Sequence, residues 1–390
     1  MTAGTGTTPG PPAQAAEVGG PRAGVGTAHH RGTVLHFIAR WLPVSEGFVY
    51  DLVGHVDYRG IVVADRPLEN TERFPHAELH SLGTLRRMLP GALAQRAATG
   101  ALLWWATTGR ADVVHAHHGY EVDHVLGLVR RRRVPFVLSL HGDDVTGLVT
   151  RDPAFYRRAV PLVSAVVVPS RFLVDHALAA GFRPEQVRVI PSGVDTELFS
   201  PAPLPSGDPE VLFVGRFVEK KGLDVLGAAW PSVQRAVPRA RLRIFGVGPL
   251  ESLARAIAGN VEVVLAPTRT MVRDAMRRAR VVVSPSRTAA GDSVESLLVV
   301  NLEAQASGRP VVTTRHGGIP EYVRPGTTAL VVPEGDAAAL AEALVALVRD
   351  DALASRLAAA GPEWAGQFDL RRTAAQMASL YDELRGLAAP

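Results

Sequence analysis

The chain has 390 residues, of which 47% are hydrophobic and 21% charged, and its formal net charge at pH 7 is +4. This length predicts two or three domains, and this composition is typical of a globular α/β enzyme. The absence of cysteine excludes disulfides and thiolate chemistry, and no apolar run approaches the roughly 20 residues of a membrane-spanning helix.

Residues 1–32 consist mainly of Gly, Pro, Ala and Thr and predict a disordered tail. The segment lacks the basic start and the apolar core of a secretory signal peptide. Together with the lack of cysteine, this favours a cytoplasmic location.

Along the rest of the chain, short β-branched runs alternate with alanine-rich helical stretches. This alternation predicts parallel sheets with helices on both faces. In the first half the expected strands are residues 33–39, 60–64, 112–116, 135–140, 165–169 and 187–190. In the second half they are residues 210–215, 241–246, 261–265, 281–284, 310–314 and 329–332.

Four prolines in the ten residues 200–209 predict a linker of limited flexibility. It separates two doubly wound domains, which we place at residues 33–203 and 208–366. The ligand site of such a domain lies outside the carboxyl ends of its strands. We therefore expect the two domains to face each other across a cleft that is lined by the motifs following each strand.

Histidines follow two strands of the first domain. His115 and His117 alternate along one strand and should face the same way, so a metal site is conceivable. No carboxylate follows at a spacing that would complete such a site, so we predict no metal and interpret both as polar lining of the cleft. His141 ends the next strand and is expected to contact a sugar hydroxyl in the cleft. The alternative is a structural histidine at a strand end.

The second domain opens with a strand that ends at Gly215, where the missing side chain lets the backbone approach a ligand. Arg216 and Lys221 follow, and two cations there can neutralise a departing diphosphate without a metal. The alternative is that both pair with acids on the surface.

Gly246 and Gly248 form a turn after the next strand. The third glycine of a dinucleotide fingerprint is missing, which argues against an NAD site. The turn either packs against a nucleotide or is a simple tight turn.

Glu295 and Glu303 enclose seven residues in a stretch that predicts the opening of a helix ending at Gly308. Eight residues along a helix separate the two carboxylates by about 12 Å, which suits two hydroxyl groups on one extended ligand. Free helix amides between them suit a diphosphate. The alternative is that both carboxylates are solvated on the surface.

The run Arg130–Arg133 suits an anionic membrane surface, and it equally suits a solvated helix end, where cations complement the helix dipole. We favour the helix end, and peripheral membrane contact stays open as the alternative. Nucleic acid is not an expected partner, because no basic stretch is interleaved with stacking aromatics.

Taken together, these motifs resemble those of the retaining nucleotide-sugar glycosyltransferases of family 4, which have the two-domain GT-B fold. The pair Glu295 and Glu303 resembles the family's E-x7-E motif. Residues 215–222 are similar to its G-R-x4-K-G motif. Residues 190–199 and 316–321 resemble its I-P-N-G-V-D-x-x-x-F and G-G-I-P-E segments.

Two further segments support this resemblance. Residues 43–49 resemble the P-x-S-E-T-F motif of the colanic-acid and exopolysaccharide branch, and related sequences serve natural-product pathways that include antibiotics. Residues 369–387 resemble the terminal helix that crosses back onto the first domain in this fold.

The resemblance implies roles for particular residues. Catalytic roles fall to Arg216, Lys221, Glu295 and His141, donor binding to Gly215, Gly246, Leu298, Val299 and Glu303, and acceptor binding to Ser45, Glu46 and Gly47. Ser296 stands where the family usually has glycine, which leaves the donor preference open.

The implied reaction moves a hexose or amino-hexose from a nucleoside diphosphate, with UDP favoured, to an acceptor hydroxyl of a glycan or natural product. It retains the anomeric configuration and requires no cofactor beyond the nucleotide-sugar co-substrate. The alternatives are a nucleotide-sugar epimerase of the same fold and a non-catalytic subunit that binds a sugar nucleotide.

Overall fold

The computed structural model describes residues 30–41, 47–289 and 294–386. Most of the predicted disordered tail, the acceptor-loop residues Ser45 and Glu46, and the last residue of the predicted terminal helix lie outside these ranges.

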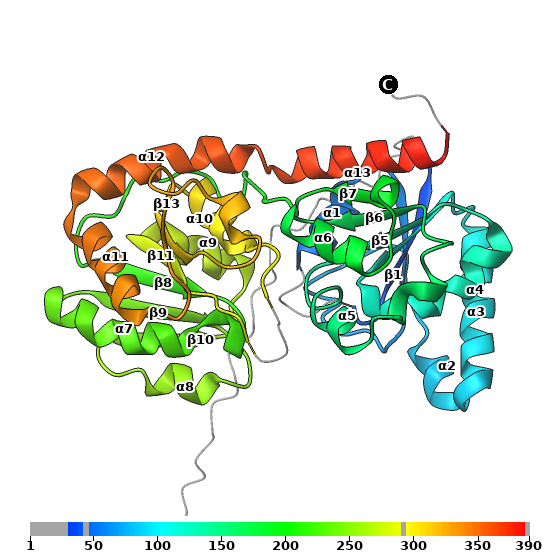
Figure 1. The fold of residues 1–390 in the computed structure, drawn as a ribbon, viewed down its shortest axis with the longest axis horizontal. Helices are drawn as coiled ribbons and strands as arrows, with labels where there is room; N and C mark the ends of the chain where they lie inside the picture. The colour runs from blue at the N-terminus through cyan, green and yellow to red at the C-terminus, as the bar shows by residue number, and fades with distance from the viewer. Residues whose placement is uncertain (1–29, 42–46, 290–293, 387–390) are drawn as a thin grey trace, which may run out of the picture.

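Two parallel sheets, each packed against helices, form the two halves of the molecule (Figure 1). The first has seven strands in the order β3-β2-β1-β4-β5-β6-β7, and the second has six in the order β10-β9-β8-β11-β12-β13. Every paired strand runs parallel to its neighbour. This confirms the predicted α/β architecture of two Rossmann-like domains.

All twelve expected strands are present, and each end lies within one residue of its expected position. The first sheet comprises β1 Thr33–Ile38, β2 Arg59–Ala64, β3 Leu79–Ser81, β4 Val113–His117, β5 Phe136–Ser139, β6 Ala165–Val168 and β7 Val187–Val189. The second comprises β8 Glu210–Val214, β9 Arg241–Gly246, β10 Val261–Leu265, β11 Val281–Ser284, β12 Val311–Thr314 and β13 Ala329–Val332. The sequence did not predict β3, because its three partly buried residues form no apolar run.

Helices connect the strands in both halves. In the first they are α1 Gly47–His55, α2 Gly83–Met88, α3 Gly91–Thr108, α4 Val122–Arg132, α5 Gly147–Arg151 and α6 Phe172–Ala179. In the second they are α7 Leu223–Ala236, α8 Glu251–Ala256, α9 Arg269–Arg278, α10 Val299–Ala306, α11 Ala337–Arg349 and α12 Asp351–Gly366. No helix in the described part of the chain is long and apolar enough to cross a bilayer.

Several inner strands are buried along their whole length, as expected for strands with helices on both faces. Every residue of β1, β4 and β11 is buried. This explains why the sequence shows continuous apolar runs rather than an alternating pattern.

The last helix, α13 Leu370–Leu384, continues the line of α12 but packs on the first sheet (Figure 1). Its Met377 and Tyr381 join a cluster with Val34 and Val137 of the first domain. The predicted terminal helix therefore does cross back. At the crossing, the backbone of Val194 bonds to those of Phe368 and Leu370 at 2.9 Å each.

The proline-rich linker is held by the buried guanidinium of Arg309. It donates to the carbonyl of Pro203 at 2.8 Å and to that of Ala202, and within its own domain to those of Ser307 and Ala279. All four of these partners are backbone carbonyls, and burial lowers the pKa of Arg309 to about 10. One side chain thus fixes the path of the linker against the second domain.

Replacing Arg309 with alanine should lower the free energy of unfolding by about 2–4 kcal/mol, because several buried carbonyls lose their donor. Urea denaturation followed by circular dichroism measures the loss. The matched control is Arg278→Ala, which removes an exposed arginine of the same domain. Equal urea midpoints for Arg309→Ala and Arg278→Ala would contradict the role of Arg309 in holding the linker.

Candidate functional site

The predicted cations and the first glutamate of the E-x7-E motif meet at the carboxyl edge of the second sheet. Lys221 ends a short 3-10 helix after β8, and its Nζ lies 2.9 Å from Glu295 Oε1. The Nζ of Lys220 lies 3.6 Å from the same oxygen. Burial would raise the pKa of the Glu295 carboxyl, but Lys221 and Lys220 outweigh it and hold this pKa below its usual value. Glu295 is therefore anionic although only 5% of it is exposed.

Arg216 lies beside this pair and is exposed. It forms no ion pair with any residue that the structure describes, so the alternative of a surface salt bridge does not hold for it. Its charge contributes to lowering the pKa values of both Glu295 and Lys221. Lys220, Lys221 and Arg216 carry three positive charges against the one negative charge of Glu295. The site therefore has an excess of positive charge at the point where a diphosphate is expected.

The predicted position of Glu295 on a helix is wrong. Helix α10 begins only at Val299, because Leu298 has the extended backbone angles φ −114° and ψ 99°. Glu295 therefore lies in the loop before the helix, and the 12 Å separation along one helix does not apply. Leu298 and Val299 stand at the N-terminus of α10, where backbone NH groups lack partners within the helix and attract anions.

Glu303, the second glutamate, belongs to a cluster of charges from both domains. Burial raises the pKa of its carboxyl to about 7; Arg269 opposes this shift, whereas Asp51 and Asp195 add to it. Arg269, the first residue of α9, forms an ion pair with Asp51 of α1 at 2.7 Å. Spacing along the chain could not predict this cluster, because its members come from four separate segments.

Gly246 packs against the loop that carries the cations. A Cβ there would come within 1.9 Å of the Gly215 carbonyl oxygen, so glycine is required for the two loops to approach. The structure thus shows a tight approach of the two loops at Gly246, and the donor-binding role of Gly246 stays a prediction. Gly222 is constrained similarly, with φ +68° and a Cβ position 1.9 Å from the Pro285 carbonyl.

His141 follows β5 and faces the donor loop from the first domain. Its backbone NH and that of Gly142 donate to Asp144 Oδ1 at 2.9 Å each, which fixes the loop. Burial, with a contribution from His118, lowers the pKa of His141 well below its usual value, so the imidazole is neutral. Its buried Nε2 has no hydrogen-bond partner among the described residues. A neutral ring with one nitrogen unused suits a sugar hydroxyl.

Ser296 connects the two halves of the site. Its hydroxyl donates to the backbone carbonyl of His141 at 2.5 Å, so the loop after Glu295 is tied directly to the His141 loop. A glycine, usual at this position in the family, cannot make this bond. Glu321 makes a second link by accepting from the backbone NH groups of Arg171 and Phe172, each at 2.7 Å. The two domains are therefore in direct contact at two places, and one of these contacts involves the loops that carry Glu295 and His141.

Three buried histidines lie beside the site. His36 of β1, which the sequence analysis missed, joins His115 and His117, and their ligand atoms lie within 4.8 Å of one another. His36 Nδ1 and His117 Nε2 are 2.9 Å apart, and His115 bonds to Ser139 Oγ at 2.7 Å and to Tyr381 OH at 2.6 Å. Metal binding would require breaking these bonds, so we interpret the group as a hydrogen-bonded network. The absence of a metal remains a prediction.

A cavity opens next to this network, at the carboxyl edge of the first sheet. His117 lines it, whereas His115 is buried behind it against α13, so only one of the two histidines faces the cleft as predicted. Gly47, the one described residue of the predicted acceptor loop, begins α1 directly before Phe48. The lining residues are Phe48, Val49, Leu52, His117, Ser139, His141, Val167, Pro169, Ile190, Pro191, Ser192, Gly193, Thr373 and Met377.

Comparison with known proteins gives the family. Residues 45–198 match the family model described as "Glycosyltransferase Family 4", and residues 208–350 match the one described as "Glycosyl transferases group 1". A phosphatidyl-myo-inositol mannosyltransferase of Mycobacterium leprae is 32% identical over 71% of this chain and 75% of its own. The chain belongs to the family 4 glycosyltransferases.

Other family 4 relatives differ in their named substrates. A GDP-mannose-dependent α-(1-6)-phosphatidylinositol monomannoside mannosyltransferase of Mycolicibacterium smegmatis is 35% identical, with 76% of each chain covered. The putative colanic acid biosynthesis glycosyltransferase WcaL of Escherichia coli is 31% identical over 63% of this chain and 64% of its own.

Solved structures confirm the GT-B fold of this family 4 chain. Anabaena HepE in complex with UDP and glucose has a TM-score of 0.73 at 19% identity, covering 89% of this chain and 98% of its own. Sucrose-phosphate synthase from Thermosynechococcus elongatus also has a TM-score of 0.73, at 21% identity, covering 91% and 99%.

Replacing Glu303 with glutamine should change stability in a pH-dependent way. The folded-state pKa of about 7 lies above the usual 4.5, so the folded state binds more protons, and stability falls as pH rises through this window. Glutamine cannot ionise, so the thermal midpoint of the variant relative to the parent should be higher at pH 8 than at pH 5. The control is Glu363→Gln on the exposed surface of α12. If the difference in thermal midpoint between Glu303→Gln and the parent does not change with pH, the raised pKa of the Glu303 carboxyl is contradicted.

Replacing Ser296 with alanine should lower kcat about tenfold and leave the donor KM within about twofold, since one hydrogen bond of about 1.4 kcal/mol is lost from the closed state. Steady-state kinetics with acceptor measure kcat and the donor KM. The same assay without acceptor measures the share of donor that is hydrolysed, and this share should rise in the variant. Ser296→Thr keeps the hydroxyl and is the rescue control. Unchanged kcat in Ser296→Ala would overturn the role of this residue in positioning His141.

Proposed function

We propose that the chain is a retaining glycosyltransferase that moves a hexose or amino-hexose from a nucleoside diphosphate to an acceptor hydroxyl. The observation that carries this proposal is the placement of Arg216, Lys220 and Lys221 around the buried Glu295, opposite the neutral His141. This arrangement suits a negatively charged leaving group on one side and a sugar on the other.

In the proposed reaction, the bond from the anomeric carbon to the phosphate oxygen breaks while the acceptor oxygen attacks from the same face. The acceptor proton passes to the leaving phosphate. Arg216 and Lys221 hold the developing charge of the diphosphate, and the N-terminus of α10 adds its dipole. The contacts between the domains exclude water, so that the sugar reaches the acceptor rather than being hydrolysed.

Glu303 is proposed to bind the ribose hydroxyls and Glu295 the transferred sugar. Three cations near one site make a divalent metal unnecessary for charge neutralisation, so we expect activity in the presence of a chelator. The acceptor is proposed to enter beside α1, because Phe48, which follows the predicted acceptor residue Gly47, lines the cavity.

The nucleobase of the donor can be identified by measuring which nucleoside diphosphate binds. Family base rates favour UDP, whereas the relatives named above include a GDP-mannose-dependent enzyme. A thermal-shift panel with UDP, GDP, dTDP and ADP, with and without magnesium, decides between them. A ligand at 100 times its dissociation constant adds about 2.7 kcal/mol of stability. One diphosphate should stabilise the parent without magnesium and should fail to stabilise Glu303→Ala.

Arg216→Ala should lower turnover by at least about a hundredfold while leaving the thermal midpoint within a degree or two, because its side chain is exposed and forms no ion pair with the described residues. Release of nucleotide from the identified donor measures turnover. The matched control is Arg278→Ala on α9, which removes an exposed arginine without an ion pair to the described residues and should keep near-parental rates. Retained turnover in folded Arg216→Ala would refute the assigned role.

The same assays separate the alternatives. An epimerase would release free nucleotide and a rearranged sugar without any acceptor, and a binding subunit would show the thermal shift with no turnover at all.

A further inference from the structure

The outer surface of α2 and α3 exposes apolar side chains to an unusual degree. Met88, Trp104 and Leu93 are 73%, 61% and 54% exposed, and the other large hydrophobic side chains in the described part of the chain are at most 43% exposed. Leu93 and Trp104 are eleven positions apart, about three helical turns, so they lie on the same side of α3. This helix lies at the end of the first domain farthest from the second (Figure 1).

The charged side chains of this surface are almost all basic. Residues 83–111 contain no aspartate or glutamate. Helix α4 lies alongside α3, since Arg132 reaches Thr107, and it also contacts α2, since Arg86 of α2 bonds to His124. The exposed arginines on or directly after the three helices are Arg87, Arg96, Arg110, Arg130, Arg131 and Arg133. The one exposed acid on these helices is Asp123.

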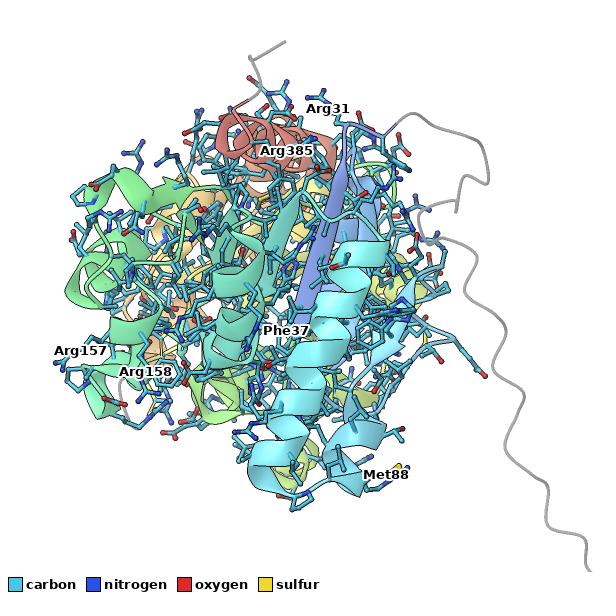
Figure 2. The ribbon with its side chains drawn as sticks, turned by 90° about the vertical axis from the view of Figure 1, so that its right-hand side faces the viewer. Arg31, Phe37, Met88, Arg157, Arg158 and Arg385 are labelled. Carbon is cyan, nitrogen blue, oxygen red and sulfur yellow. The ribbon has the colours of Figure 1, made fainter. Side chains whose placement is uncertain are left out.

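These arginines form no ion pairs with the described residues, so their charge is not neutralised within the fold. Figure 2 shows the same surface face on, with α3 as the long cyan helix nearest the viewer and Met88 of α2 to the right of its lower end. Helices α2, α3 and α4 pack side by side as one layer, which carries the three exposed apolar side chains and the exposed arginines. We call this layer the outer face.

An anionic bilayer fits the outer face better than a second copy of the chain does. In a symmetric dimer the same patch meets itself, so the arginines would face one another with almost no acid to pair with them. A bilayer surface supplies the negative charge, and its interface accepts tryptophan and aliphatic side chains.

We propose that the outer face docks the enzyme on an anionic lipid bilayer and that its acceptor is held at that surface. This rests on the proposed glycosyltransferase function and narrows its acceptor from any glycan or natural product to a membrane-anchored one. The run Arg130–Arg133, which the sequence alone favoured as a solvated helix end, is then part of the docking surface.

The test is flotation of the purified full-length protein with vesicles of phosphatidylcholine alone or with about 30% phosphatidylglycerol. We expect binding only to the anionic vesicles, weakening as salt is raised. Arg130→Glu/Arg131→Glu should reduce binding at least tenfold. Its matched control is Arg157→Glu/Arg158→Glu, which makes the same change of charge at an exposed pair in the same domain but away from the outer face (Figure 2).

Trp104→Ser should also reduce binding several-fold, whereas Met271→Ser, at an exposed methionine of the second domain, should not. Equal losses in both arginine pairs would show an effect of net charge only and overturn the proposal, as would equal binding to both vesicle types. Self-association that Trp104→Ser abolishes would identify a second copy as the occupant instead. All variants should keep the parental stabilisation by nucleotide diphosphate, so loss of docking is distinguishable from failure of the proposed function.

Discussion

The ionised state of Glu295 is the constraint on which the candidate site depends. A carboxylate that is almost fully buried would normally take up a proton, and Lys221 at 2.9 Å prevents this. Lys221 can stand there because Gly222 lets the chain turn tightly against Pro285. The ion pair thus fixes two loops of the second domain and leaves Arg216 free of the pair, toward the expected position of the diphosphate.

The second half of the site depends on contact between the domains. Asp51 and Arg269 come from opposite domains, and their ion pair lies within electrostatic reach of Glu303. The bond from Ser296 to His141 makes a similar connection nearer the sugar position. A donor bound between these points would therefore contact groups whose positions are set only when the domains are together, which is how closure excludes water from a transfer reaction.

Helix α13, which crosses onto the first sheet, is also connected to the first-domain side of the site. Tyr381 packs beneath the first sheet and bonds to His115, which bonds in turn to Ser139 at the end of β5. His141 lies two residues beyond Ser139. The helix that joins the domains is therefore connected, through hydrogen bonds in a buried layer, to the strand end that precedes His141.

The sequence by itself determined the two sheets, since β-branched runs such as Val281–Ser284 are buried on both faces and admit no other element. It also determined that Arg216, Lys221 and His141 lie near the cleft, because each follows a parallel strand. Only the tertiary structure decided where α10 begins, because the extended backbone of Leu298 interrupts a stretch that the residue pattern alone predicts as helical. Only the tertiary structure could bring His36 to His117 and Asp51 to Arg269, because such pairs are set by strand order and domain closure and leave no spacing to detect along the chain.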